Sequence, residues 1–151
     1  MQIDHILTPQ RTFAGVQGVS KKRVLELIGK LVAQHSHLDP ETIYESLIAR
    51  EKLGSTGFGN GIAIPHCRLD GCHKAVGALL QLQDKIDFDA LDGEPVDLIF
   101  VLLVPLEATE QHLQILKMLA SKLDQAELRS ALREAPDAES LYRIMTTDEG
   151  S

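Results

Sequence analysis

The amino-acid sequence predicts a single α/β domain of three layers, in which a mixed β-sheet is flanked by helices on both faces. The predicted elements follow the order helix, helix, strands, helices, which suits a sheet with helices packed on it. The strand predicted at residues 96–104 is apolar on both of its alternating faces, apart from Asp97. Such a strand is buried when helices cover both faces of the sheet. A length of 151 residues is typical of one domain.

The N-terminal part of the chain is predicted to contribute an edge strand and two helices. Residues 12–16 are expected to form a short strand at the edge of the sheet. Ser20 is the expected N-cap of a helix over residues 21–35, in which apolar residues recur at helical spacing. Asp39 is the expected N-cap of a second helix over residues 40–53, because a proline and then an acid follow it.

The middle of the chain is predicted to supply most strands of the sheet. Apolar residues 62–64 predict a short buried strand, and residues 75–83 predict a longer strand with alternate apolar positions. Residues 86–88 indicate a further strand edge, and residues 91–95, which include glycine and proline, indicate a turn. The strand at residues 96–104 comes next and ends at a proline.

The C-terminal part of the chain is predicted to be helical. Thr109 is the candidate N-cap of a helix that covers residues 109–123. Amphipathic patterns at residues 125–134 and 137–145 predict two more helices, and Pro136 separates them. These helices are expected to bury their apolar faces against the sheet.

The composition narrows the possible classes of function. With a formal net charge of −7, nucleic-acid binding is not expected, and the basic residues 21–23 predict only a solvated helix start. No apolar run approaches the ~20 residues of a membrane span, and residues 1–10 lack a signal-peptide pattern. We therefore expect a cytoplasmic protein without membrane insertion. Its domain is expected to span residues 1–147, and residues 148–151 are expected to be a disordered tail.

The strongest candidate for chemistry is His66, which follows a glycine-rich loop and a short strand. The loop at residues 54–60 has many free backbone N–H groups, which are able to surround an anion such as phosphate. Pro65 ends the strand at residues 62–64 and presents the imidazole on a stiff support, before a polar turn at residues 68–71. Histidine is a competent nucleophile near neutral pH. A lone histidine is also commonly structural, so these residues by themselves leave both interpretations open.

Four residues of the glycine-rich loop are candidates for hydrogen bonds to phosphate oxygens. They are Ser55, Thr56, Gly59 and Asn60. Their hydroxyl, amide and backbone groups have suitable donors. Runs of this composition also form plain turns, which is the alternative interpretation.

Two further residues, Arg50 and His112, lie where helix ends are expected to meet the anion loop. Arg50 falls in the last turn of the helix over residues 40–53. It is placed either to answer the negative end of the helix dipole or to face an anion. His112 lies one turn before Leu116 on the apolar stripe of its helix. It either caps the core or faces a ligand at the sheet rim, where the helix N-terminus favours phosphate.

The two cysteines suggest a zinc site, which we consider and set aside. Together with His66 and His73, the residues Cys67 and Cys72 give four soft ligands. The pattern His-Cys-x4-Cys-His does not have the spacing of structural zinc sites. Two cysteines are also too few for a secreted disulfide framework. No metal and no other cofactor is therefore expected.

The stretch from Glu51 to His66 resembles the signature of the enzyme IIA domains of the fructose/mannitol type in the bacterial sugar phosphotransferase system. That signature is an acidic or amide residue, six free positions, and then apolar-Gly-two free-apolar-Ala-apolar-Pro-His. Here Glu51 is followed by six residues and by Phe58-Gly59-Asn60-Gly61-Ile62-Ala63-Ile64-Pro65-His66, so every constrained position matches. The resemblance extends over about residues 1–147. Without an attached transporter domain, the chain is most similar to the stand-alone nitrogen-regulatory branch.

The resemblance implies a fold, a reaction and partners. The family fold is a five-stranded mixed sheet flanked by helices. His66 would accept a phosphoryl group from a histidine-containing phosphocarrier protein of the HPr or NPr type, with Arg50 contacting phosphate and His112 as the second active-site histidine. Regulatory targets such as transporters or kinases, linked to nitrogen and potassium, would respond to the phosphorylation state. The alternatives are a sugar-specific enzyme IIA that passes phosphate to a fructose or mannitol IIB subunit, and a binding protein with a vestigial histidine.

Overall fold

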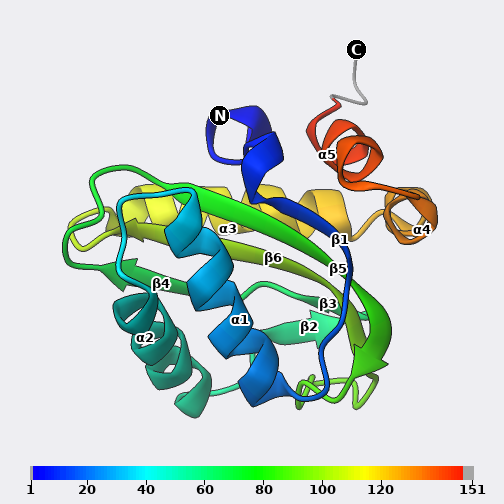
Figure 1. Ribbon diagram of the computed structural model, residues 1–151, viewed down its shortest axis with the longest axis horizontal. Helices are drawn as coiled ribbons and strands as arrows, with labels where there is room; N and C mark the ends of the chain where they lie inside the picture. Colours follow the sequence, from blue (N-terminus) through cyan, green and yellow to red (C-terminus); the bar gives the residue numbers. More distant parts are fainter. Residues whose placement is uncertain (1, 148–151) are drawn as a thin grey trace.

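A mixed sheet of six strands lies at the centre of the computed structural model, which describes residues 2–147 (Figure 1). The strands are β1 (Thr12–Val16), β2 (Gly57–Gly59), β3 (Ile62–Ala63), β4 (His66–Leu69), β5 (Val76–Ile86) and β6 (Val96–Pro105). The order across the sheet is β1-β5-β6-β3-β2, and β4 also pairs with β6. The pairs β1–β5, β3–β6 and β4–β6 are parallel, whereas β5–β6 and β2–β3 are antiparallel. The predicted tail at residues 148–151 lies outside the described residues.

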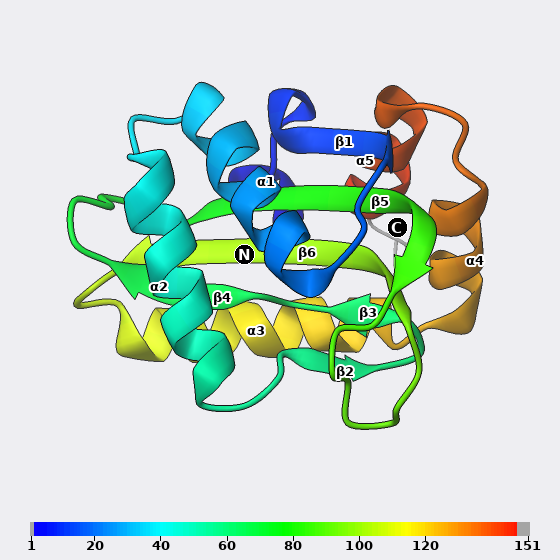
Figure 2. The same ribbon diagram turned by 60° about the horizontal axis from the view of Figure 1, so that its bottom comes forward.

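Helices cover both faces of this sheet (Figure 2). The helices are α1 (Lys21–Gln34), α2 (Pro40–Lys52), α3 (Thr109–Leu123), α4 (Ala126–Glu134) and α5 (Ala138–Thr146), with short 3-10 turns η1 (Ile3–His5) and η2 (Pro9–Arg11) near the N-terminus. Residues of α1 and α2 share one buried cluster with Ala78 and Ile99, and residues of α3, α4 and α5 share the other with Leu79 and Phe100. The predicted three-layer α/β architecture is confirmed.

Side-chain caps start two of the helices as predicted. The Ser20 hydroxyl accepts a hydrogen bond from the Arg23 N–H at 3.2 Å, and the Asp39 carboxylate accepts one from the Thr42 N–H at 2.9 Å. These bonds satisfy N–H groups that the first helical turn leaves without partners. The close contact between α1 and α2 needs Gly29, because a Cβ atom there would lie 2.7 Å from the carbonyl oxygen of Pro40.

The predicted start of α3 is wrong in detail. Thr109 is the first helical residue, and the N-cap is Ala108, which makes no side-chain capping bond. The most buried residue of the first turns is Ile115, whereas Leu116 is only partly buried. The helix therefore begins without a capping side chain that the sequence could have indicated.

The predicted strand boundaries are also wrong in two places. Residues 75–83 and 86–88 were expected as separate strands, but β5 continues to Ile86 with a register irregularity after Gln81. Residues 68–71 were expected to form a turn, but β4 includes Arg68 and Leu69 because they pair with β6. Pairing with β6 extends β4, so that His66 is the first residue of a strand and is not followed by a turn.

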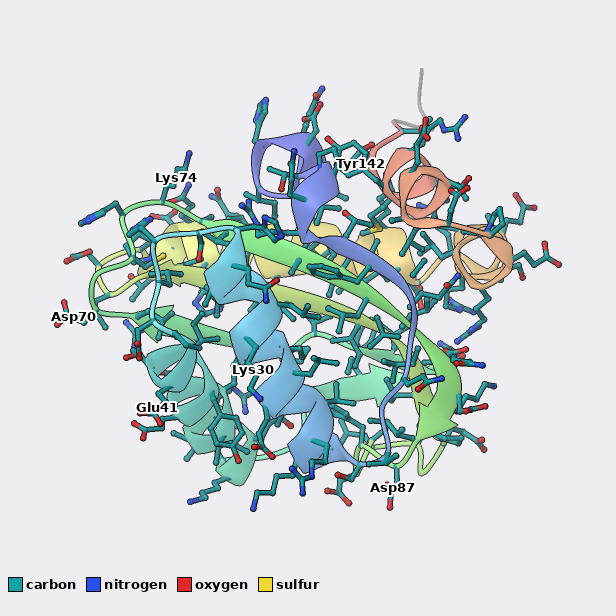
Figure 3. The ribbon with its side chains drawn as sticks, in the orientation of Figure 1. Lys30, Glu41, Asp70, Lys74, Asp87 and Tyr142 are labelled. Carbon is teal, nitrogen blue, oxygen red and sulfur yellow. The ribbon has the colours of Figure 1, made fainter. Side chains whose placement is uncertain are left out.

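Many charged side chains lie on the outside of this architecture. Figure 3 shows Glu41, Asp70 and Asp87 projecting outwards from a helix, a turn and a loop, and all three residues are exposed. None of the helices within residues 2–147 combines the length and the apolar character needed to cross a bilayer.

Candidate functional site

A pocket of about 410 Å³ lies where α2 ends, β4 begins and α3 begins. It is lined by Ala49, Arg50, Leu53, His66, Cys67, Arg68, Leu106 and His112. The three residues that the sequence singled out for catalysis, Arg50, His66 and His112, therefore come together from three different elements. This pocket is the candidate functional site.

Strand β4 presents His66 to the pocket through its alternating side chains. Cys67 and Leu69 are buried against the sheet, while His66 is half-buried and Arg68 is exposed. His66 was expected to follow a strand at residues 62–64, but the strand ends at Ala63 and His66 starts the next one. Both short strands pair in parallel with β6, so the imidazole has a fixed backbone on both sides of the break.

One ring nitrogen of His66 is occupied and the other is not. Nδ1 lies 2.7 Å from the carbonyl oxygen of Ile64, two residues earlier in the chain. A carbonyl oxygen accepts only, so Nδ1 carries the hydrogen and donates it. The neutral ring then keeps its lone pair on Nε2. The geometry thus leaves Nε2 as the ring nitrogen of His66 that has an available lone pair.

His112 faces His66 across the pocket. The two rings meet edge to face, with their centroids 5.2 Å apart and their planes at 83°. The backbone N–H of His112 donates to the Ala108 carbonyl at 2.9 Å, which places the side chain in the first turn of α3. Its Nε2 is buried and has no hydrogen-bond partner among residues 2–147. A buried ring nitrogen without a partner is costly unless a ligand supplies one.

Burial and positive charge lower the pKa of both imidazoles and so favour their neutral forms. Burial lowers the pKa of His66, and the charge of Arg50 lowers it further, against opposing effects of the Ile64 hydrogen bond and the Glu51 carboxylate. Burial also lowers the pKa of His112, and the charges of His66, Arg68 and Arg50 act in the same direction. A neutral His66 has the free lone pair that a nucleophile needs.

Arg50 is oriented by the loop that follows α2. Its Nη1 donates to the carbonyl oxygen of Gly54 at 2.9 Å. The side chain is half-buried in the pocket wall, and no ion pair to a carboxylate is found for it within residues 2–147. The position of Arg50 is therefore compatible with both interpretations: its charge lies near the negative end of the α2 dipole, and its side chain lines the pocket.

Arg68 is a pocket residue that the sequence interpretation missed. It was assigned to a polar turn, so its side chain had no predicted direction. Strand β4 instead places it two positions after His66, on the same face. Continuing the two-residue periodicity of a strand beyond His66 would have revealed it.

The four loop candidates do not line this pocket. The Ser55 hydroxyl donates to the Phe88 carbonyl at 2.8 Å, and Thr56 donates from both its N–H and its hydroxyl to the Glu51 carboxylate. The Asn60 N–H donates to Asp92 at 3.1 Å, and a Cβ atom on Gly59 would lie 3.3 Å from the same carboxylate. Much of the expected open loop instead forms the hairpin of β2 and β3. The donors described above for Ser55, Thr56 and Asn60 form hydrogen bonds within the protein.

Glu51 joins α1, α2 and the start of β2 through a buried carboxylate. It is 9% exposed, it accepts the N–H of Thr56 at 3.1 Å, and it forms an ion pair of 2.9 Å with Lys21 Nζ. Lys21 also lies 4.8 Å from the ring centroid of Phe88. The predicted solvated helix start at residues 21–23 is thus wrong for Lys21. This network fixes the loop that orients Arg50.

Burial disfavours the reactive thiolate form of both cysteines. Cys67 and Cys72 are free and buried, and burial raises the pKa of Cys67 to about 12. His73 stacks on His37, with ring centroids 5.3 Å apart. In the described part of the chain, no three His, Cys, Asp or Glu side chains are grouped as metal ligands.

Comparisons with known proteins agree on one family. The family model described as phosphoenolpyruvate-dependent sugar phosphotransferase system, EIIA 2, matches residues 5–147. A nitrogen regulatory protein of Pseudomonas aeruginosa is 59% identical over 96% of this chain and 95% of the relative, and that of Escherichia coli is 44% identical over 100% and 93%. The crystal structure of nitrogen regulatory protein IIA-Ntr from Neisseria meningitidis matches with a TM-score of 0.90 and 44% identity, over 95% of this chain and 99% of that one.

We predict that His66 and His112 both titrate below the ordinary value of 6.5 in the folded protein. Because the unfolded chain then binds protons more readily, the free energy of unfolding should decrease as the pH falls below 6.5. NMR titration of the ring protons in folded and urea-unfolded protein measures both midpoints. A folded-state midpoint at or above the unfolded one would contradict the burial of that ring.

We predict that Glu51→Ala lowers the free energy of unfolding by about 3 kcal/mol, because it leaves the Lys21 charge and the Thr56 donors without their buried partner. The matched control is Glu26→Ala, which removes a carboxylate 3.7 Å from Arg23 in an exposed pair. Surface pairs of this kind contribute about 1 kcal/mol or less. Urea denaturation of both variants measures the difference, and equal losses would refute a structural role for the Glu51 network.

Proposed function

Since this chain belongs to the phosphotransferase system EIIA 2 family, we propose that it is a phosphoryl carrier that becomes phosphorylated on Nε2 of His66. One observation carries this proposal. The free Nε2 side of the His66 ring shares a pocket with Arg50 and with the unpartnered Nε2 of His112. A nucleophile, a cation and a hydrogen-bonding group are what acceptance of a phosphoryl group requires.

The proposed step is an in-line displacement between two imidazoles. The Nε2 lone pair of His66 forms a bond to phosphorus as the nitrogen–phosphorus bond of the donor breaks, and the donor ring keeps that electron pair. Such a transfer is nearly isoenergetic, so catalysis depends on positioning and on charge stabilisation. During attack the His66 ring gains positive charge. The hydrogen bond from Nδ1 to the Ile64 carbonyl stabilises that charge without a proton transfer.

Arg50 and His112 are proposed to bind the oxygens of the moving phosphoryl group. The guanidinium of Arg50 is held by Gly54 and supplies a fixed positive charge. His112 would donate from Nε2–H, which gives this buried nitrogen the partner that it otherwise lacks. The three residues thus take the roles of nucleophile, charge stabiliser and oriented donor.

The donor is proposed to be a histidine-containing phosphocarrier protein of the HPr or NPr type. The names of the relatives, nitrogen regulatory proteins at 44% and 59% identity, support a regulatory role over the sugar-specific alternative. We therefore propose that cytoplasmic targets linked to nitrogen or potassium, such as transporters or kinases, respond to the phosphorylation state of His66. A phosphoryl group adds close to two negative charges at a rim that includes the exposed Leu53 and Leu106, so target binding would change with modification.

We predict that this protein gains a single phosphoryl group when it is incubated with phosphoenolpyruvate, the first enzyme of the system and the phosphocarrier. Intact mass measures the addition, which should be lost in acid and retained in base. His66→Ala should abolish it, whereas His5→Ala, on an exposed histidine outside the pocket, should not. Phosphorylation that survives in His66→Ala, or nitrogen-15 spectra that place phosphorus on Nδ1, would refute the assignment.

We predict that Arg50→Ala and His112→Ala each slow phosphoryl acceptance by at least about tenfold, which corresponds to roughly 1.4 kcal/mol in the barrier. Each loses a group that stabilises the phosphoryl oxygens, while the fold keeps its buried clusters. Lys52→Ala is the matched control, because it removes an exposed cation from the same last turn of α2. Rapid-quench kinetics with the phosphocarrier measures the rates. Transfer at the parent rate would assign the altered residue a structural role only.

A further inference from the structure

The pocket contains a second guanidinium, that of Arg68, to which the catalytic roles above give no task. Arg68 lies two positions after His66 on β4, so both side chains leave the same face of the strand. It lines the same pocket as Arg50 and His112. Its charge also acts on His112, as one cause of the lowered pKa of that ring.

The guanidinium of Arg68 has unused donors. Its one hydrogen bond to another described residue goes from Nη1 to the Leu106 carbonyl and is 3.3 Å long. No carboxylate within residues 2–147 forms an ion pair with it. Arg133 offers a contrast, because its Nε lies 3.0 and 3.1 Å from the two carboxylate oxygens of Asp97. Within residues 2–147 neither pocket arginine has an acidic partner, although the chain has a net charge of −7, so both guanidiniums are available to an anion.

The charge expected of the phosphorylated ring exceeds the positive charge of one arginine. A phosphoryl group on an imidazole carries close to two negative charges near neutral pH, by analogy with other phosphorylated side chains. Arg50 supplies one positive charge, and Glu51 acts on His66 in the opposite direction. A second guanidinium would balance the remaining charge, and Arg68 is a pocket residue with donors available for it among the described residues.

We propose that Arg68 is a second phosphate-binding cation, which approaches the phosphoryl group on His66 from β4 while Arg50 approaches it from α2. This inference rests on the proposed phosphorylation of His66. It assigns to Arg68 a contact with the reacting group, beyond its bond to the Leu106 carbonyl. Loss of Arg68 would then leave the phosphoryl oxygens with one guanidinium and the His112 donor.

The test uses potassium phosphoramidate, a chemical phosphoryl donor for histidine, so that no phosphocarrier is needed. Phosphorus-31 NMR follows the His66 resonance, identified by its absence in His66→Ala, as the pH is varied. In the parent protein two guanidiniums should hold the phosphoryl-group pKa down. In Arg68→Ala that pKa should rise by about one unit, and Arg68→Lys should recover part of the difference.

The control is Arg23→Ala, which removes an exposed arginine of α1 outside the pocket and should leave the phosphoryl-group pKa at the parent value. Equal pKa values in the parent and in Arg68→Ala would overturn the inference, as would an equal rise in the Arg23→Ala control. Failure of phosphoramidate to give a His66 resonance would also overturn it. If that resonance forms but the phosphocarrier cannot phosphorylate His66, the proposed relay function fails while the role of Arg68 stands.

Discussion

The break between β3 and β4 is the constraint on which the site depends. Both short strands pair in parallel with β6, and Pro65 lies between them with its carbonyl oxygen accepting the Leu102 N–H at 2.9 Å. Proline has no N–H to donate, so the chain leaves regular pairing there. The Ile64 carbonyl is thereby free to meet Nδ1 of His66. A continuous strand would carry that carbonyl away from the ring and leave the tautomer of the imidazole unspecified.

The buried Glu51 network makes the other wall of the pocket rigid. A carboxylate at 9% exposure is costly unless it is paired, and Lys21 and Thr56 supply the charge and the donors that offset the cost. The hydrogen bond between Glu51 and Thr56 also spans the loop that follows α2. Gly54 lies within that loop, and its carbonyl oxygen accepts the hydrogen bond from Arg50. The orientation of Arg50 thus depends on a buried ion pair whose residues do not line the pocket.

Local signals predicted the helices well, while pairing between distant strands was not predictable. Ser20 and Asp39 cap their helices through bonds to residues three positions later, so the information lies within one turn. The extent of β4 depends on pairing with β6, in which each partner residue lies 36 positions later in the chain, as for His66 and Leu102. Arg68 was missed because residues 68–71 were interpreted as a turn and the strand periodicity was not continued beyond His66. The internal partners of the loop were not predictable for a similar reason, because the N–H groups of Thr56 and Asn60 donate to Glu51 and to the distant Asp92, and the phosphate role expected of the loop stays a prediction.

One arrangement of charge suits both states of the proposed carrier. Arg50 lowers the pKa of His66, so it opposes a proton on the ring, and the same guanidinium would favour a phosphoryl group bound to it. Each pKa unit corresponds to about 1.4 kcal/mol of preference between the charged and neutral ring. Protons compete with phosphorus for the Nε2 lone pair, since a protonated ring has no pair to donate. In the proposed carrier, a cationic pocket inside an acidic protein would therefore discriminate between the two electrophiles by their charge. It would disfavour the proton and favour the anionic phosphoryl group.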